Sequence, residues 1–328
     1  MGNQMNIVDT LVLQGLQGVG ARSLCKVLEF SKEVGLGTLE ELAEFDTKQI
    51  PLRVVPKSLI ELLSEADFEH VRASAEHQIE QWASEGIHLI QIYSDQYPSQ
   101  LLALEAPPPV LYCKGNLALL KQTRSIAVIG TRNNTPRGGT ITRQTVKALQ
   151  PRGFSVVSGL AIGIDTIAHR SALDLGVPTI AVLVDLAKIA PSQNRGLADE
   201  ILANDGLLIA ENKPGTQAIP ALFAKRDRIQ AGLAAGVFAI ETDINGGTMH
   251  AVSAAAKMGR PVYVPDPVAA RYEDLTEMAI QGTQLLARDN RARYYTSESY
   301  AAMFEELEVI ARGLRMGGDE QYKTNQQD

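Results

Sequence analysis

Several residue types are scarce in this sequence, and each scarcity argues against a class of protein. The two cysteines, Cys25 and Cys113, cannot form a disulfide framework and fit a reducing compartment. The five histidines show neither the HExxH spacing nor the Cys/His spacing of a metal site, so a structural zinc ion is not expected. No run of about 18 apolar residues occurs, so no membrane span is expected.

The N-terminus also lacks the basic and then apolar pattern of a secretory signal, so we expect a cytoplasmic protein with no membrane partner. What the chain does have is enough apolar residues to form a sizeable interior. Its 328 residues, 45% of them hydrophobic, are sufficient for two or three domains.

The charge of the chain is unevenly distributed. A net charge of −7 argues against binding to a nucleic acid when the chain is taken as a whole. However, residues 1–123 have a net charge of −7, residues 124–267 one of +4, and residues 268–328 one of −4. The basic excess is therefore confined to the central block, which indicates an anionic ligand for that block.

The first part of the chain has the pattern of short helices. Amphipathic segments are predicted over 6–13, 23–30 and 69–86, and we place a helical N-terminal domain at residues 1–85. The turn Leu16–Arg22 resembles a helix-hairpin-helix, whose backbone amides hold a DNA phosphate, but an ordinary glycine turn between packed helices fits it better.

From residue 124 the pattern becomes a regular alternation of apolar strands and helices. Strands are predicted over 125–129, 154–158, 179–184, 207–210, 237–240 and 261–264, after two earlier strands at 88–93 and 110–115. Helices are predicted over 140–149, 194–204, 223–235 and 248–258. This alternation predicts an α/β fold with a doubly wound, largely parallel sheet.

The last part of the chain has a weaker pattern. We place the α/β domain at residues 86–270 and a C-terminal region at 271–328. That region should have helices over 275–286 and 299–314 and a polar, disordered tail over 316–328.

The stretch Ser158–His169 joins a predicted strand to a predicted helix through a turn with two glycines, Gly159 and Gly163. Glycines allow a backbone to approach a ligand closely, and the N-terminus of a helix presents unpaired N–H groups to an anion. The stretch predicts either a phosphate-binding turn or a tight turn without a ligand, and the residues alone do not separate these two interpretations.

Three other segments should meet this turn, because ligands bind at the carboxyl ends of the strands in such sheets. One follows the first strand of the alternation and contains Gly130, Thr131, Arg132 and Arg137. The others are the basic cluster Lys225, Arg226 and Arg228 and the glycine-rich helix entry at Gly247 and Thr248. Any one of them could be an ordinary turn or a solvated face, but their convergence at one edge predicts a site for a polyanion or a nucleotide.

These segments, in this order, resemble the DNA-processing protein A (DprA, Smf) family. The resemblance rests on motifs that are spread over residues 8–267 and include Ile129-Gly130-Thr131-Arg132, Ser158-Gly159-Leu160-Ala161, Gly163-Ile164-Asp165, Arg226-Asp227-Arg228 and Gly247-Thr248. An ordered series of this kind is more specific than any single motif.

The resemblance implies an extended Rossmann domain that binds single-stranded DNA and helps to load a RecA-type recombinase during natural transformation. It also implies a homodimer, an N-terminal domain similar to a sterile-alpha-motif fold, no cofactor and no catalysed reaction. By motif position, the phosphate contacts would come from Gly130, Thr131, Arg132, Gly159, Gly163, Arg226 and Arg228.

The family usually has the pattern Phe-Pro-x-Arg-Asn-Arg. This chain has Ala224 in place of the proline and Asp227 in place of the asparagine. Asp227 adds a negative charge where a DNA phosphate should lie. Two alternatives therefore stay open: a nucleotide-binding sensor and an interaction protein that has lost its ligand. A related family of nucleoside-monophosphate hydrolases has a glutamate where this chain has Ala251, which argues against hydrolysis. His169 and His250 are expected to pack or to cap helices.

Overall fold

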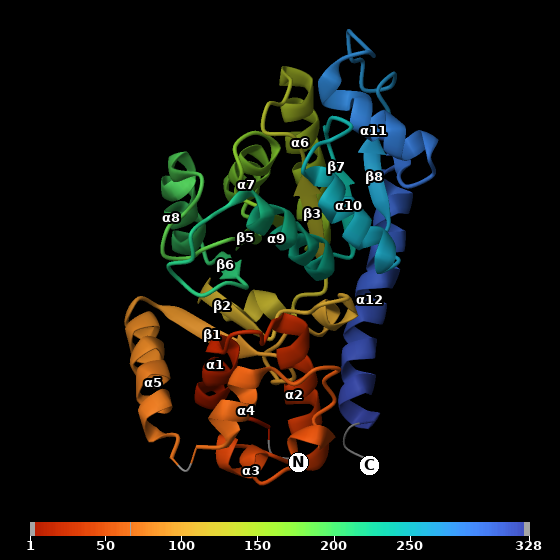
Figure 1. Ribbon diagram of the computed structural model, residues 1–328. Coiled ribbons are helices and arrows are strands. Elements are labelled where there is room, and N and C mark those ends of the chain that lie inside the picture. The colour runs from red at the N-terminus through yellow and green to blue at the C-terminus, as the bar shows by residue number, and fades with distance from the viewer. Residues whose placement is uncertain (1–3, 66, 325–328) are drawn as a thin grey trace. The chain divides into compact units, whose positions relative to one another are not determined.

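The computed structural model describes residues 4–65 and 67–324 (Figure 1), which form two compact units. Unit 1 comprises residues 1–95 and 105–111, and unit 2 comprises residues 96–104 and 112–328. The domain boundaries expected at residues 85 and 270 stay predictions. By their contacts, residues 86–95 group with unit 1 and the C-terminal helices group with unit 2.

Unit 1 is built from short helices and one strand. Its elements are α1 (Ile7–Gly15), α2 (Ala21–Val34), α3 (Leu39–Ala43), the 3₁₀ turn η1 (Thr47–Gln49), α4 (Lys57–Leu63), α5 (Glu69–Ser84) and β1 (Ile87–Gln91). Helix α2 buries Leu24, Val27 and Leu28 on one face, which is the apolar spacing that its sequence predicts. Helices are thus present in each segment of residues 1–85 where they were expected.

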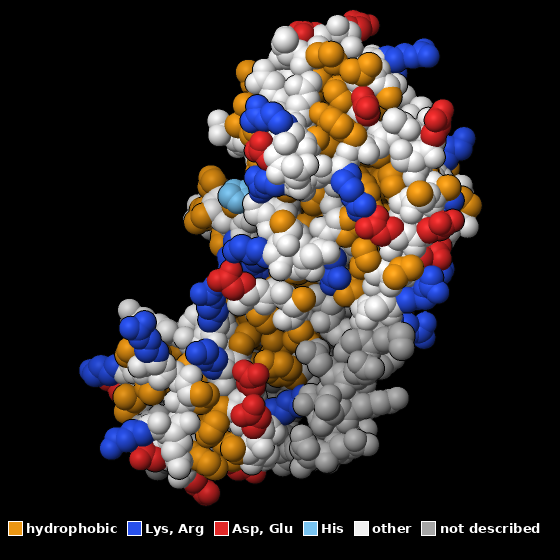
Figure 2. Space-filling model, turned by 90° about the vertical axis from the view of Figure 1, so that its right-hand side faces the viewer, with side chains coloured by type: hydrophobic (Ala, Val, Ile, Leu, Met, Phe, Trp, Pro, Cys, Tyr) orange, Lys and Arg blue, Asp and Glu red, His pale blue; other side chains and the backbone are white. Residues whose placement is uncertain are grey.

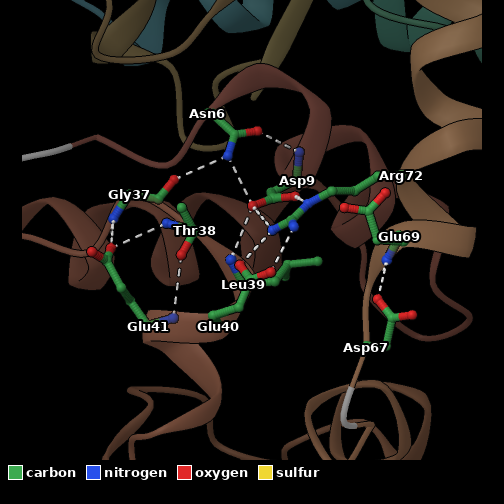
Figure 3. Close-up of polar contacts among 10 residues, drawn as sticks. All are labelled: Asn6, Asp9, Gly37, Thr38, Leu39, Glu40, Glu41, Asp67, Glu69 and Arg72. Atoms are coloured by element: carbon green, nitrogen blue, oxygen red, sulfur yellow. Dashed lines mark hydrogen bonds and ion pairs between the residues drawn. The ribbon is translucent and has the colours of Figure 1, made fainter.

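A buried carboxylate, that of Asp9, joins three elements of unit 1 (Figure 3). It accepts hydrogen bonds from the backbone N–H of Leu39 at 2.9 Å and from the side chain of Asn6 at 2.8 Å. Arg72 of α5 donates to both of its oxygens, at 2.6 and 2.9 Å, and donates to Glu40 as well. Hydrogen bonding from Arg72 lowers the pKa of Glu40 to about 2. Because Arg72 donates to both oxygens of Asp9, its guanidinium compensates the buried charge of that carboxylate.

Replacing Arg72 should destabilise unit 1. Arg72→Ala leaves the carboxylate of Asp9 buried without its cation, so we expect the free energy of unfolding to fall by about 3 kcal/mol. Urea unfolding followed by the fluorescence of Trp82, the single tryptophan, measures this change. Arg53→Ala removes an exposed arginine of the same unit and should change the free energy by less than about 0.5 kcal/mol. Equal losses in the two variants would contradict the assignment.

The sheet has the order β1-β2-β6-β5-β4-β3-β7-β8-β9. After β1, its strands are β2 (Val110–Gly115), β3 (Ser125–Ile129), β4 (Ser155–Ser158), β5 (Thr179–Leu183), β6 (Leu207–Ala210), β7 (Gly236–Ala239), β8 (Val262–Pro265) and β9 (Arg293–Tyr295). All neighbours from β6 to β9 are parallel, and β2 runs antiparallel to β6. The predicted α/β fold with a doubly wound, largely parallel sheet is confirmed.

Among its described residues, unit 2 has seven α-helices, which cover the two faces of the sheet (Figure 1). They are α6 (Pro136–Leu149), α7 (Ile164–Asp174), α8 (Arg195–Ala203), α9 (Pro220–Leu233), α10 (Thr248–Lys257), α11 (Met278–Arg288) and α12 (Tyr300–Thr324). One apolar core contains residues of α6, α7 and α12, and a second contains residues of α9 and α10. Short 3₁₀ turns complete the unit: η2 (Ser99–Ala103), η3 (Leu117–Lys121), η4 (Gln150–Arg152) and η5 (Ser192–Asn194).

Three local expectations need correction. Helices α6 and α9 begin earlier than predicted, at Pro136 and Pro220, because proline is well tolerated in the first turn of a helix. The short strand β9 was not predicted. The tail expected to be disordered over 316–328 is helical as far as Thr324, since adding residues to an existing helix costs little, and residues 325–328 lie outside the described part of the chain.

The face of the molecule drawn in Figure 2 shows side chains of both charge signs interspersed with hydrophobic ones. Such a mixture is typical of a solvated surface and does not indicate a polyanion. Among residues 4–65 and 67–324, no helix is long and apolar enough to cross a membrane.

Candidate nucleic-acid interface

A cavity of about 490 Å³ lies at the carboxyl edge of the parallel sheet, where β3 and β7 are neighbours. The order of the strands reverses at this point, because β4, β5 and β6 continue on one side of β3 and β7 and β8 on the other. Ligands of doubly wound sheets bind at such a reversal. The lining residues come mainly from the loops after β3, β4 and β7 and from helices α7, α9 and α10.

The loop after β3 forms one wall of the cavity and is held by backbone hydrogen bonds on both sides. The N–H of Thr131 donates to the carbonyl of Glu241 at 2.7 Å, and its carbonyl accepts from the N–H of Ile164 at 3.2 Å. Gly163 has a φ of +84° and lies so close to the carbonyls of Thr131 and Arg132 that a Cβ atom would overlap them. This tight contact holds the backbone at Arg132, whose side chain is exposed and lines the cavity.

The turn that follows β4 is held by the carboxylate of Asp165, which lies in the first turn of α7. The buried Asp165 accepts hydrogen bonds from the N–H of Gly159 at 3.0 Å and of Ala161 at 3.4 Å. Burial raises the pKa of Asp165, and the nearby Arg226 opposes that rise. The N–H of Gly159, predicted to contact a phosphate, is therefore already satisfied, and the space above this glycine is filled by the guanidinium of Arg226.

The three basic residues predicted on α9 have different partners. Arg226 is buried, donates to the carbonyl of Val182 at 2.6 Å and lines the cavity. Lys225 and Arg228 both form ion pairs with the buried Glu211, at 3.1 and 2.6 Å. The charges of Lys225 and Arg228 are thus partly compensated within the protein, and neither residue lines the cavity.

Helix α9 also brings an aromatic ring and a carboxylate to the cavity. The guanidinium carbons of Arg132 and Arg226 lie 5.6 and 5.9 Å from the ring centre of Phe223, within the range of cation–π contacts. Asp227 lies beside Arg226, with 3.3 Å between Oδ1 and the arginine Nε. Burial raises the pKa of Asp227 to about 7, because the opposing effect of Arg226 is smaller. Asp227 therefore changes its charge near neutral pH.

The other acidic residues at the strand ends are engaged in the fold. Glu241 accepts from the backbone N–H and hydroxyl of Thr135, at 2.9 and 2.6 Å, and from the hydroxyl of Tyr272 at 2.8 Å. These contacts anchor the start of α6 to the end of β7. Both Glu241 and Asp165 thus hold backbone turns.

The two histidines that follow the strand ends, His169 and His250, differ in their surroundings. His169 is buried, with Nδ1 at 2.7 Å from the hydroxyl of Thr179, and burial together with Arg226 lowers its pKa to about 3. It is therefore neutral and packed in the core at physiological pH. His250 is exposed and lines the cavity. In the described part of the chain no group of three or more His, Cys, Asp or Glu side chains could hold a metal ion.

The structure brings just over half of the predicted site residues together. The cavity is lined by Gly130, Thr131, Arg132, Arg226, Gly247 and Thr248. Arg137, Gly159, Gly163, Lys225 and Arg228 lie outside its lining. Gln230 was missed, although its spacing of three and seven residues from Asp227 and Phe223 places all three on one side of a helix.

The fold and the cavity define a Rossmann-like protein with a crevice at the strand reversal that is lined by two arginines. A family model described as DNA recombination-mediator protein A matches residues 88–308. The chain belongs to this family.

Relatives of this chain come from several bacteria. It is 34% identical to the DNA processing protein DprA of Bacillus subtilis over 183 residues, which are 56% of this chain and 61% of that protein. It is 33% identical to DprA of Streptococcus pneumoniae over 247 residues, 75% of this chain and 82% of that protein.

Two solved structures are also similar to this chain. DNA processing protein A of S. pneumoniae has a TM-score of 0.76 and 28% identity and covers 92% of this chain and 98% of that one. DNA processing protein A of Helicobacter pylori has a TM-score of 0.59 and 27% identity and covers 67% and 96%.

A side chain at position 159 should disturb the site. In Gly159→Ala the new methyl group overlaps the guanidinium of Arg226, so we expect a loss of about 1–3 kcal/mol in the free energy of unfolding. Gly196→Ala in α8 is the matched control, because nothing lies within 4 Å of its added Cβ, and it should not destabilise the protein. Urea unfolding compares the two, and an undisturbed Gly159→Ala protein would show that the guanidinium does not pack on this glycine.

Proposed function

We propose that this protein binds single-stranded DNA in the cavity at the strand reversal and assists recombination during natural transformation. The observation on which this rests is the pair Arg132 and Arg226, which bring two guanidinium groups to one ring, that of Phe223, inside the cavity. Guanidinium groups neutralise phosphates, and an aromatic ring offers a surface to a base. The H. pylori relative, described as binding single-stranded DNA in a unique mode, supports the proposal.

The proposed action is binding without catalysis. No bond is made or broken, no cofactor is needed, and the partners are single-stranded DNA, a RecA-type recombinase and a second copy of this chain in the cytoplasm. Phosphate contacts are assigned to Gly130, Thr131, Arg132, Gly247 and Thr248, with Arg226 as the buried cation behind them. The residues Arg137, Lys225 and Arg228 would contact DNA beyond the cavity.

Removing the charge of the exposed Arg132 should weaken the binding of single-stranded DNA and make that binding less dependent on salt. Arg132→Gln should lower the affinity for a twenty-nucleotide oligo-dT roughly tenfold at low salt and reduce the slope of log K against log salt by about 1. Fluorescence anisotropy over a salt series measures both. Arg312→Gln in α12 removes an arginine outside the cavity and should leave the slope unchanged. Absence of oligo-dT binding by the wild type at low salt would refute the function.

The charge of Asp227 should make binding depend on pH. Because its pKa is about 7, the carboxylate is mostly neutral at pH 6 and mostly charged at pH 8, so oligo-dT affinity should fall roughly fivefold over that range. Asp227→Asn should bind more tightly than the wild type at pH 8 and equally at pH 6. Comparing the two proteins at each pH removes the contribution of other groups that titrate in this range. The same affinity difference at pH 6 and pH 8 would contradict the titration of Asp227.

A nucleotide sensor is the second candidate, favoured by the size of the cavity, which is typical of small-molecule sites. Ala251 lines the cavity at the position where related hydrolases have a glutamate, so this candidate is a binding protein and not a hydrolase. Thermal-shift measurements separate the candidates. A sensor would be stabilised by a mononucleotide, whereas the proposed function requires stabilisation by oligo-dT at much lower concentrations.

A further inference from the structure

Three cavity-lining side chains follow one another along a single side of α9: Phe223, Asp227 and Gln230. The side-chain amide of Gln230 donates to Oδ1 of Asp227 at 2.8 Å. This bond assigns the amide nitrogen to the position next to Asp227 and the oxygen, Oε1, to the other position. The two residues therefore present oxygen atoms next to each other, and the aromatic ring lies one to two helical turns before them.

Asp227 and Gln230 each have a side-chain acceptor without a hydrogen-bond partner among the described residues. Oε1 of Gln230 is buried and has no hydrogen-bond partner among the described residues, which is unusual for a buried polar atom. The contacts of Asp227 with Gln230 and Arg226 both use Oδ1, so Oδ2 is left for a ligand. The cavity thus contains two neighbouring acceptors that need hydrogen-bond donors.

The four DNA bases differ in how many neighbouring donors they offer to such a pair. Guanine has two, N1–H and the N2 amino group, on its Watson–Crick edge. Adenine and cytosine each have one amino group beside a ring nitrogen that accepts, and thymine has one N–H between two carbonyl oxygens. A carboxylate next to an amide oxygen therefore matches guanine, while adenine, cytosine and thymine would place an acceptor against an acceptor.

We propose that Asp227 and Gln230 determine base specificity in this cavity and make it select guanine in single-stranded DNA. The inference rests on the proposed function and adds a preference to it. The groups that face Asp227 are Arg226, Arg132 and Asp165, and Asp243 and His250 also line the cavity. The guanidinium groups supply donors for O6 of guanine. At pH 8 Asp227 is mostly a carboxylate, so its Oδ2 accepts one donor of the base while Oε1 of Gln230 accepts the other.

The test uses the full chain at pH 8 and labelled twenty-nucleotide oligonucleotides in which every fourth dT is replaced by one other nucleotide. Fluorescence anisotropy should give an affinity for the dG-containing strand that exceeds that for the dA-containing strand by about 5- to 100-fold, the range of one bidentate base contact. Hypoxanthine lacks the N2 amino group, so the strand with deoxyinosine should have an intermediate affinity.

Two variants assign the preference to the two side chains. Asp227→Asn should bring the ratio of dG to dA affinity close to one while binding oligo-dT more tightly than the wild type at pH 8. Gln230→Leu has a similar volume without the acceptor and should lower the ratio several-fold. Far-UV circular dichroism and urea unfolding check that both variants are folded.

The outcomes separate the preference from the function. Equal affinity of the wild type for all strands would overturn the guanine assignment and leave single-stranded DNA binding intact. A preference that persists in both variants would overturn the role of these residues. No binding of any strand would overturn the proposed function and the assignment with it.

Discussion

The buried guanidinium of Arg226 is the group on which the site depends. It lies against Gly159, donates to the carbonyl of Val182 and is close to Asp165 and Asp227. A buried cation is tolerated only when hydrogen bonds and opposite charges surround it. Strands β4 and β5 and helix α9 are therefore tied together by one side chain, and the loop after β3 is placed against the same turn through Gly163. The cavity has a defined shape because these neighbours cannot separate without leaving the charge uncompensated.

The number of basic residues on α9 overstates the positive charge that the crevice offers to a ligand. Helix α9 has three cations within four positions, but Glu211 pairs with two of them and Asp227 with the third. Such pairing reduces the attraction for a phosphate and makes it sensitive to the protonation of Asp227. A crevice of this kind suits a ligand that offers hydrogen-bond donors and an aromatic surface in addition to negative charge, as a nucleotide within a strand of DNA does.

Much of the architecture was predictable because it depends on local patterns. The strands at 125–129 and 207–210 match the prediction in full, since runs of buried apolar residues between glycines and polar residues form strands in this class of fold. The parallel order and the site at the carboxyl edge follow from the alternation with helices. Local patterns say less about the ends of elements, so that α6 and α9 begin at Pro136 and Pro220, a few residues before their predicted starts.

The sequence by itself determined the fold class, the family and the segments that meet at the crevice, because strand ends in a parallel sheet converge whatever the details of packing. Only the tertiary structure decided which of the gathered residues remain available to a ligand. Lys225 and Arg228 lie one and two positions from Arg226, yet their charges are partly compensated by Glu211, which follows strand β6. Gln230 matters because its side-chain oxygen has no hydrogen-bond partner among the described residues and the residue lines the cavity. Such facts arise from contacts distant in sequence, which no local pattern records.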